Sequence, residues 1–170
     1  MSSTPANIPV ATTPVIESTP VPKSYAKSIA TTSDPWDVCL TLEYGGDRSF
    51  AWSIHQQVTH TPPASWTQVE DRLLASLAVP ACTAAACAFF CEMLALVGSA
   101  RSVPVLASLL RQPNTRESAR YALEAIPGAE VDTALRDALA ELTGDAKAGL
   151  IGTIAARQDA AASSAKPSPR

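Results

Sequence analysis

The sequence is short of the residues that build β-sheets, membrane spans and secretion signals. Aromatic residues make up 5% of its 170 positions, and glycine occurs only seven times. Such a composition, rich in alanine and leucine, favours close-packed helices over sheet. No uninterrupted apolar run is long enough to span a membrane. The first residues lack the positive charge and apolar core of a secretion signal, so we expect a cytoplasmic protein.

The motifs of common catalytic sites are also missing. The sequence contains no G-x-S-x-G, no Walker A motif and no G-x-G-x-x-G. Its two histidines, His55 and His60, are five residues apart and therefore do not share a helix face. Neither histidine belongs to a His-Glu dipeptide. We therefore expect no catalytic residues, no metal, no cofactor and no enzymatic activity.

The cysteine pattern matches none of the usual metal or redox motifs. Cys39 stands apart, whereas Cys82, Cys87 and Cys91 fall in one predicted helix, and none of them forms a C-x-x-C pair. In a helix, Cys87 and Cys91 would share a face and Cys82 would lie about 140° from Cys87. The favoured interpretation is four buried, reduced cysteines that act as small hydrophobic residues. A metal site and a disulfide are the alternatives.

Charge is distributed unevenly along the chain. The segment from Asp34 to Ala162 carries 15 acidic and 9 basic residues, whereas the basic residues of the two tails are few and scattered. Binding to nucleic acid requires a clustered basic face that neutralises phosphates. The acidic body therefore predicts that nucleic acid is not a partner.

The segment before Asp34 differs in composition from the rest. It contains five prolines and twelve serines and threonines, with few large apolar residues. Such a segment buries too little surface to offset its loss of conformational entropy. We expect disordered tails at residues 1–33 and 163–170, on either side of a folded segment at 34–162.

Apolar periodicity and capping residues predict eight helices within the folded segment. Asp34 is a suitable N-cap, and Pro35 suits the first helical position because it has no N–H. Glycine or proline follows most of the predicted helices. The predicted ranges are Pro35–Glu43, Arg48–Thr59, Trp66–Leu77, Cys82–Val97, Ser102–Leu110, Thr115–Ala125, Glu130–Leu142 and Asp145–Ala156.

An internal repeat organises the second half of this segment. The group Leu94, Val97 and Gly98 recurs 29 positions later as Leu123, Ile126 and Pro127, and Ile151 and Ile154 close a third unit at nearly the same spacing. Two helical patterns per unit at a fixed period are typical of a solenoid. Because the links are short, we expect antiparallel helix pairs in an α-solenoid. Its parts are an N-terminal cap at 34–63 and repeats at 64–100, 101–128 and 129–157.

Three stretches carry a family resemblance: CEMLALVGSARSVPVLASLL, ARYALEAIPGAEVDTALRDAL and AGLIGTIAARQDAA. They resemble bacterial HEAT repeats of the short type, also called PBS-lyase HEAT-like after the phycobilisome lyases. The resemblance implies an armadillo-type, all-α fold that serves as a scaffold for protein binding. It also implies an alternative, in which the chain is an accessory or lyase-like subunit acting on a chromophore or a partner enzyme.

The resemblance places the second helix of each pair on the concave surface, which is where HEAT arrays bind. In the helix at 115–125, the apolar stripe is formed by Ala119, Ala122, Leu123 and Ile126. The opposite side carries the predicted binding residues for a protein partner of unknown identity, which are Glu117, Arg120, Tyr121 and Glu124. The alternatives are a solvated face with intrahelical pairs and an Arg120 that pairs with Asp132 of the next repeat.

Two further expectations concern the ends of the array. Trp36, Trp52 and Trp66, together with Tyr44, Phe50 and the Phe89-Phe90 pair, are expected to build an aromatic core in the first half. At the other end, the sequence after ARQDAA becomes ASSAKPSPR instead of another V-P-x-L helix. Leu150, Ile151 and Ile154 of the last helix would then keep apolar surface exposed, and self-association through this C-terminal repeat is expected.

Overall fold

Eight α-helices make up the part of the chain that the computed structural model describes, which is residues 34–164. This part contains no β-strand, so the all-helical fold class predicted from the sequence is confirmed. The expectations for residues 1–33 and 165–170 lie outside the described residues. The helices are α1 (Pro35–Cys39), α2 (Ser49–His60), α3 (Trp66–Leu77), α4 (Ala84–Val97), α5 (Val103–Leu110), α6 (Arg116–Ala125), α7 (Ala129–Glu141) and α8 (Gly144–Ser164).

The N-terminal helix begins as predicted but ends early. Asp34 caps α1 by accepting a hydrogen bond from the N–H of Trp36 at 3.0 Å, and Pro35 occupies the first turn. The helix stops at Cys39, whereas the sequence predicted an end at Glu43. Thr41 accounts for this difference because its hydroxyl donates to the carbonyl of Val38 at 3.0 Å, which competes with a further helical turn.

Two other helix boundaries differ by two or more residues from those predicted, and the remaining differences are of one residue. Helix α4 begins at Ala84 rather than Cys82, because Thr83 is the N-cap and its hydroxyl accepts a hydrogen bond from the N–H of Ala86 at 3.1 Å. Helix α8 continues to Ser164, beyond the predicted end at Ala156. The extension is rich in alanine and contains neither glycine nor proline. The first two residues of the predicted 163–170 tail are therefore helical.

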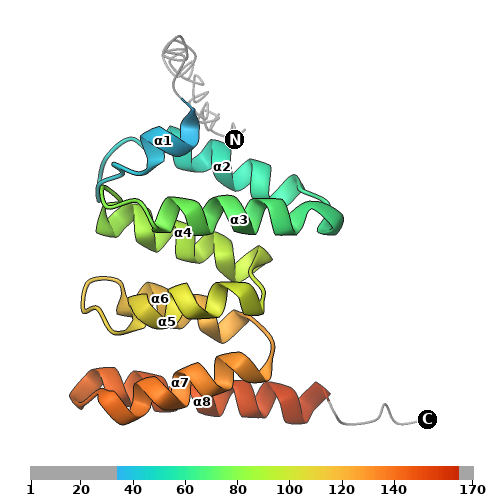
Figure 1. The fold of residues 1–170 in the computed structure, drawn as a ribbon, viewed down its shortest axis with the longest axis vertical. Helices are drawn as coiled ribbons and strands as arrows, with labels where there is room; N and C mark the ends of the chain where they lie inside the picture. Colours follow the sequence, from blue (N-terminus) through green and yellow to red (C-terminus); the bar gives the residue numbers. More distant parts are fainter. Residues whose placement is uncertain (1–33, 165–170) are drawn as a thin grey trace, which may run out of the picture. The chain divides into compact units, whose positions relative to one another are not determined.

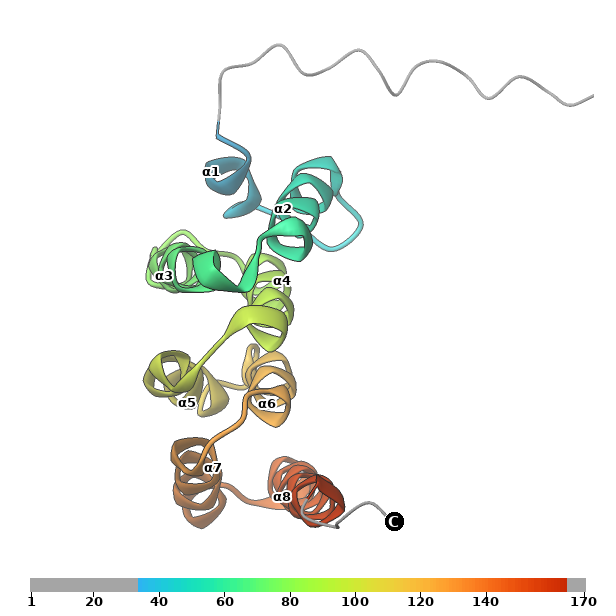
Figure 2. The same cartoon turned by 90° about the vertical axis from the view of Figure 1, so that its right-hand side faces the viewer.

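Each helix packs against its neighbour in sequence, and the pairs pack against one another. Helix α3 contacts α4, α5 contacts α6, and α7 contacts α8. Between pairs, α4 contacts α6, α6 contacts α8, and α5 contacts α7 (Figure 1). Figure 2 shows α3, α5 and α7 in one row and α4, α6 and α8 in the other. Helices α4, α6 and α8 therefore lie side by side, as do α5 and α7.

Several polar contacts between helices, or between a helix and a turn, join residues that are about one sequence repeat apart. The N–H of Ser99 donates to the carboxylate of Glu70 on α3 at 2.8 Å, across 29 residues. Arg111, at the end of α5, donates to Glu141 of α7 at 2.7 Å, across 30 residues. The Thr153 hydroxyl of α8 donates to Glu124 of α6 at 2.9 Å, across 29 residues. The spacing between these contacts matches the repeat found in the sequence.

The contact at Glu70 is buried. Glu70 is only 2% exposed, and its carboxylate also accepts hydrogen bonds from the hydroxyls of Ser99 at 2.9 Å and Ser102 at 2.6 Å. A buried carboxylate is tolerated when donors surround it. These three donated hydrogen bonds fix the turn between α4 and α5 against α3.

Aliphatic side chains form the core along both rows of helices. Each repeated unit contributes leucines that have no exposed surface. Complete burial of a leucine stabilises the fold by about 1.5–3 kcal/mol relative to an exposed one. The leucines with no exposed surface are Leu73, Leu94, Leu106, Leu110, Leu123, Leu135 and Leu150.

The aromatic core predicted for the first half is smaller than expected. Trp36 is buried and stacks on Phe90 of α4, with ring centroids 6.2 Å apart. Trp52 is 64% exposed and Tyr44 is 72% exposed, so these two side chains lie outside the core. Trp52 falls off the stripe of α2 that faces the core, which is formed by Ala51, Ile54 and Val58. Trp66 is 39% exposed and donates its ring N–H to the carbonyl of Thr61.

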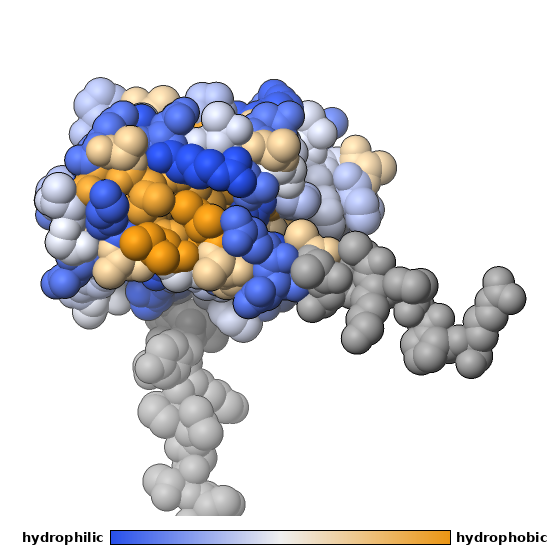
Figure 3. All heavy atoms as spheres, turned by 90° about the horizontal axis from the view of Figure 1, so that it is seen from below, coloured by the Kyte–Doolittle hydropathy of each residue, from blue (hydrophilic) through white to orange (hydrophobic). Residues whose placement is uncertain are grey.

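The surface of α7 and α8 that faces away from α5 and α6 is apolar. Figure 3 looks at this side of the molecule and shows an apolar patch with a polar rim. Ile151 is 53% exposed, and three further apolar side chains are half-buried. We call these four residues the end face: Leu139, Leu142, Ile151 and Ile154. Leu150 of α8 was also expected to be exposed, but it is fully buried.

Candidate functional site

The predicted binding residues lie on the exposed side of α6. Ala119, Ala122 and Leu123 point into the core and have no exposed surface. With 3.6 residues per turn, the remaining positions of the helix face outward. Tyr121 is 57% exposed, and the side chains of Glu117 and Glu124 are 67% and 42% exposed. Arg120 is the most covered of the four predicted residues, with 26% of its side chain exposed.

Arg120 connects α6 to α8. Its guanidinium donates to Glu117 at 2.9 Å and to Glu124 at 3.4 Å on its own helix. It also donates to the hydroxyl of Thr153 on α8 at 2.7 Å. The Thr153 hydroxyl in turn donates to Glu124, which closes a network between the two helices. Thr153 is only 1% exposed, so this network reaches into the packed interface.

The contacts of Arg120 bear on both alternatives to a binding role for this helix. The intrahelical pairs are present, because Arg120 bonds to Glu117 and to Glu124. Arg120 also holds the next helix pair, but through Thr153 and not through Asp132. Asp132 instead accepts a hydrogen bond from Arg157 at 2.8 Å. Arg120 is therefore a residue of the helix interface, and it is less available to a partner than Tyr121.

Tyr121 borders a shallow hollow between α4 and α6. The hollow has a volume of about 310 Å³ and is lined by Glu92 of α4 and by Glu117, Ser118 and Tyr121 of α6. Leu96 follows Glu92 by four residues, so both lie on the same side of α4. Leu96 is 50% exposed. The exposed surface of these two helices thus combines apolar side chains with carboxylates.

The electrostatic character of this surface is acidic. Glu92, Glu117 and Glu124 contribute three carboxylates, and Arg120 contributes a guanidinium. Because Arg120 already bonds to Glu117 and Glu124, it neutralises part of their charge, while Glu92 lies on the neighbouring helix. We call Glu92, Leu96, Glu117, Tyr121 and Glu124 the α4–α6 face.

Arg157 is a structural residue that the sequence interpretation missed. Its guanidinium donates to the carbonyls of Leu123 and Glu124 at 3.0 Å and of Ile126 at 2.6 Å. It also donates to Gly128 at 3.2 Å, so that one side chain of α8 caps the end of α6. The predicted helix ended at Ala156, so Arg157 lay outside it and was given no role. The sequence signal for a longer helix was the alanine-rich stretch after Ala156, which contains neither glycine nor proline.

The histidines do not form a metal site with their neighbours. The described residues contain no group of three or more histidine, cysteine, aspartate or glutamate side chains arranged to hold a metal ion. His60 contacts the carbonyl of Gln56 through Nδ1 at 2.8 Å, within α2. His55 stacks on Trp52 with ring centroids 5.7 Å apart. Both histidines thus make contacts within their own helix.

The cysteines are placed differently from the prediction. Cys39, Cys87 and Cys91 are buried, but Cys82 precedes α4 instead of lying within it. Because Cys82 lies outside the helix, the helical rotation does not separate it from Cys87, and the two sulfur atoms are 3.1 Å apart. All four cysteines are free thiols.

Two remaining observations bear on the class of protein. Within residues 34–164, no helix is both long and apolar enough to cross a membrane. Comparisons of the chain with models of known protein families, with curated proteins and with solved structures find no match.

Proposed function

We propose that this chain is a non-catalytic protein-interaction module, built as a HEAT-like α-solenoid whose α4–α6 face binds a protein partner. The observation that carries the proposal is the pairwise packing of helices with contacts at the spacing of the sequence repeat. Ser99 with Glu70 and Thr153 with Glu124 are both 29 residues apart. In solenoids each repeat contacts its neighbours, and the stacked helices present an extended binding surface.

The chemistry of the α4–α6 face favours a basic partner segment with an apolar anchor. Tyrosine is enriched among the residues that dominate binding energy, and Tyr121 stands exposed beside a hollow. Leu96 adds a second apolar contact, and Glu92 and Glu117 surround the hollow with negative charge. Complementary charge steers association and selects partners. The proposed ligand is therefore a lysine- or arginine-rich segment that places an apolar side chain against Tyr121.

The test combines affinity capture from native lysate with substitutions of exposed residues. The wild type is compared with Tyr121→Ala and with Glu92→Lys/Glu117→Lys, and captured proteins are identified by mass spectrometry. The matched control is Tyr44→Ala, since Tyr44 is an exposed tyrosine outside this face. Arg120 is left unchanged because its removal would disturb the contact with α8.

A partner that binds the wild type and the Tyr44→Ala control should be lost or weakened at least about tenfold in the Tyr121→Ala variant, as for a hot-spot tyrosine. Binding of the isolated partner segment should also weaken as salt is added, because exposed charges are screened. Equal capture by all variants, with unchanged helicity, would overturn the assignment of this face. A ligand lost equally from the Tyr44 variant would do the same.

A further inference from the structure

Two cysteines near the start of α4 lie within contact distance of each other. The sulfur of Cys82 is 3.1 Å from the sulfur of Cys87, and each could donate the hydrogen bond between them. Cys82 belongs to the connection that follows α3, and Cys87 lies in the first turns of α4. A disulfide has sulfur atoms about 2.05 Å apart. A side-chain displacement of roughly 1 Å would therefore bring this pair to bonding distance.

The local backbone holds the two cysteines in this arrangement. Thr83 caps α4, and the N–H of Cys87 donates to the carbonyl of Thr83 at 2.8 Å. The N–H of Cys82 donates to the carbonyl of Val79 at 3.0 Å, which turns the chain back toward the helix. Thr83 is also tied to the α1–α2 connection, because its N–H donates to Leu40 at 3.0 Å and its hydroxyl donates to Leu42. Hydrogen bonds within the α3–α4 connection, to the start of α4 and to the α1–α2 connection thus hold the two cysteines in place.

The two thiols of the pair differ in acidity. The hydrogen bond from Cys82 lowers the pKa of Cys87 to about 7, although burial opposes this change. The same hydrogen bond, together with burial, raises the pKa of Cys82, which keeps its proton. The first turn of a helix also favours a thiolate. Burial raises the pKa of the Cys39 thiol to about 11 and that of Cys91 to about 12.

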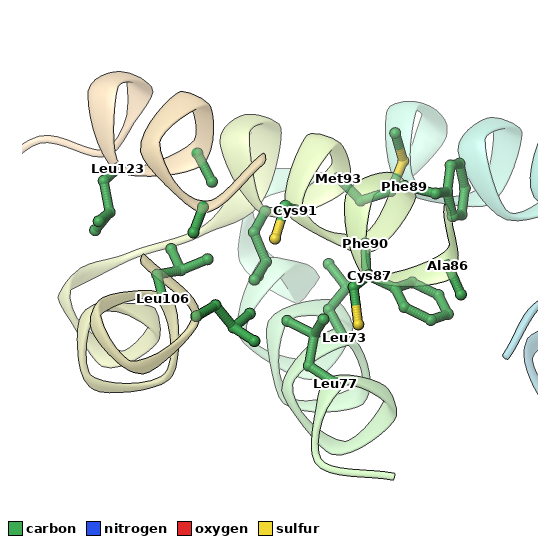
Figure 4. Close-up of a cluster of buried hydrophobic side chains, with 14 of the residues drawn as sticks. Leu73, Leu77, Ala86, Cys87, Phe89, Phe90, Cys91, Met93, Leu106 and Leu123 are labelled. Atoms are coloured by element: carbon green, nitrogen blue, oxygen red, sulfur yellow. The ribbon is translucent and has the colours of Figure 1, made fainter. Parts of the chain in front are cut away.

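Access to solvent also separates this pair from the remaining cysteines. Cys82 is partly exposed, and Cys87 directly beneath it is 6% exposed. Cys91 has no exposed surface and Cys39 has 2%. Figure 4 shows Cys87 and Cys91 on successive turns of α4 among the side chains of Leu73, Leu77 and Phe90. The Cys82–Cys87 pair therefore includes a partly exposed sulfur, whereas Cys91 has no exposed surface.

We propose that Cys82 and Cys87 form a reversible dithiol–disulfide site, with a small peroxide such as hydrogen peroxide as the oxidant. The Cys87 thiolate attacks one peroxide oxygen, the O–O bond breaks, and a sulfenic acid and hydroxide form. The Cys82 sulfur then attacks the Cys87 sulfur, the S–O bond breaks, and the departing hydroxide takes the Cys82 proton as water. Both sulfurs are oxidised and the peroxide is reduced by two electrons. A thiol such as glutathione reverses the reaction by exchange.

The test counts free thiols in the full chain after treatment with hydrogen peroxide. Denaturing alkylation and intact-mass measurement should show that two of the four thiols have disappeared, and that a thiol reductant restores both. At neutral pH the reaction should be about tenfold faster than that of an ordinary cysteine, which is only a few per cent thiolate. Fragmentation of the peptide should place the new bond between Cys82 and Cys87.

Substitution by serine assigns the role of each thiol, with Cys91→Ser as the matched control because Cys91 lies one turn from Cys87. The control should lose two thiols as the wild type does. Cys82→Ser should stop at a sulfenic acid on Cys87 that dimedone traps, and Cys87→Ser should keep all of its thiols. If the wild type keeps four thiols at peroxide levels that oxidise free glutathione, the proposal is wrong. Peptide fragments that place the disulfide at Cys39 or Cys91 would also overturn the proposal. Both of these measurements use the wild-type protein, so they do not depend on the folding of a variant.

Discussion

At the scale of single residues, Arg157 of α8 joins two other helices through its guanidinium. Its side chain is 12% exposed and donates to three carbonyls at the end of α6, to the carbonyl of Gly128 before α7, and to Asp132. The last carbonyls of a helix have no intrahelical donor and need another partner. One arginine of α8 therefore supplies the C-terminal cap of α6, and this links the stability of α6 to the presence of α8.

We expect Arg157→Ala to lower the free energy of unfolding by about 2 kcal/mol, because it leaves partly buried carbonyls without donors. Arg157→Lys should recover only part of the loss, since an ammonium lacks the planar fork of a guanidinium. Urea denaturation followed by circular dichroism measures both changes. Arg136→Ala is the matched control on the exposed side of α7 and should change stability by no more than about 0.5 kcal/mol. An equal loss in the control variant would contradict this account.

At the scale of the secondary-structure element, two glycines show how helix ends and helix interiors differ. Gly98 ends α4, and a Cβ added there would clash with the carbonyl of Leu94 and lie 2.9 Å from Cδ1 of Ile126. Gly152 lies within α8, and a Cβ added there would meet no atom within 4 Å. Glycine is therefore required at position 98 for packing, because α4 ends close to the end of α6 and leaves no room for a Cβ.

Alanine at these two positions should have opposite effects. Gly98→Ala should destabilise the protein by about 1–3 kcal/mol because the added Cβ clashes with the backbone carbonyl of Leu94 and crowds Ile126. Gly152→Ala should stabilise it by about 0.5–1 kcal/mol because glycine is a poor helix former. Thermal unfolding monitored by far-ultraviolet circular dichroism measures both changes. Stabilisation by the Gly98 substitution would show that α4 and α6 are packed less closely than this structure indicates.

At the scale of the whole molecule, the end face stands out as an apolar surface without a described helix over it. Helices α5 and α6 are covered by α7 and α8, respectively. Figure 3 shows an apolar patch on the opposite side of α7 and α8. The large apolar side chains that retain exposed surface on or next to these two helices are Leu139, Leu142, Ile151 and Ile154. Two copies of the chain could cover this surface by packing end to end, as an isologous pair.

We therefore expect the chain to self-associate as its concentration rises. The mass from light scattering should exceed the 17.7 kDa of a single chain, and Ile151→Asp should return it to that value. A charge at the centre of an apolar interface opposes association because it must be desolvated. Leu96→Asp is the control, since Leu96 is similarly exposed but lies on α4. A strict monomer at high concentration would contradict the prediction.

The sequence by itself determined the helices and most of their boundaries. Apolar periodicity and capping act over one or two turns, so Asp34 and Pro35 give local information that can be read directly. The same periodicity predicted the outward position of Glu117 and Tyr121. The period of 29 residues was also visible in the sequence, and it equals the separation of Thr153 and Glu124, which bond between α8 and α6.

Only the tertiary structure decided which side chains meet across the helices. Arg120 bonds to Thr153 instead of Asp132, Arg157 reaches the end of α6, and Cys82 lies beside Cys87. The physical reason differs between these cases. The two arginines act across 31 to 33 residues, where the rotation and offset of packed helices select the partner. For the cysteines, the N-cap at Thr83 starts α4 at Ala84 and leaves Cys82 outside the helix. The sulfur of Cys82 can therefore contact that of Cys87.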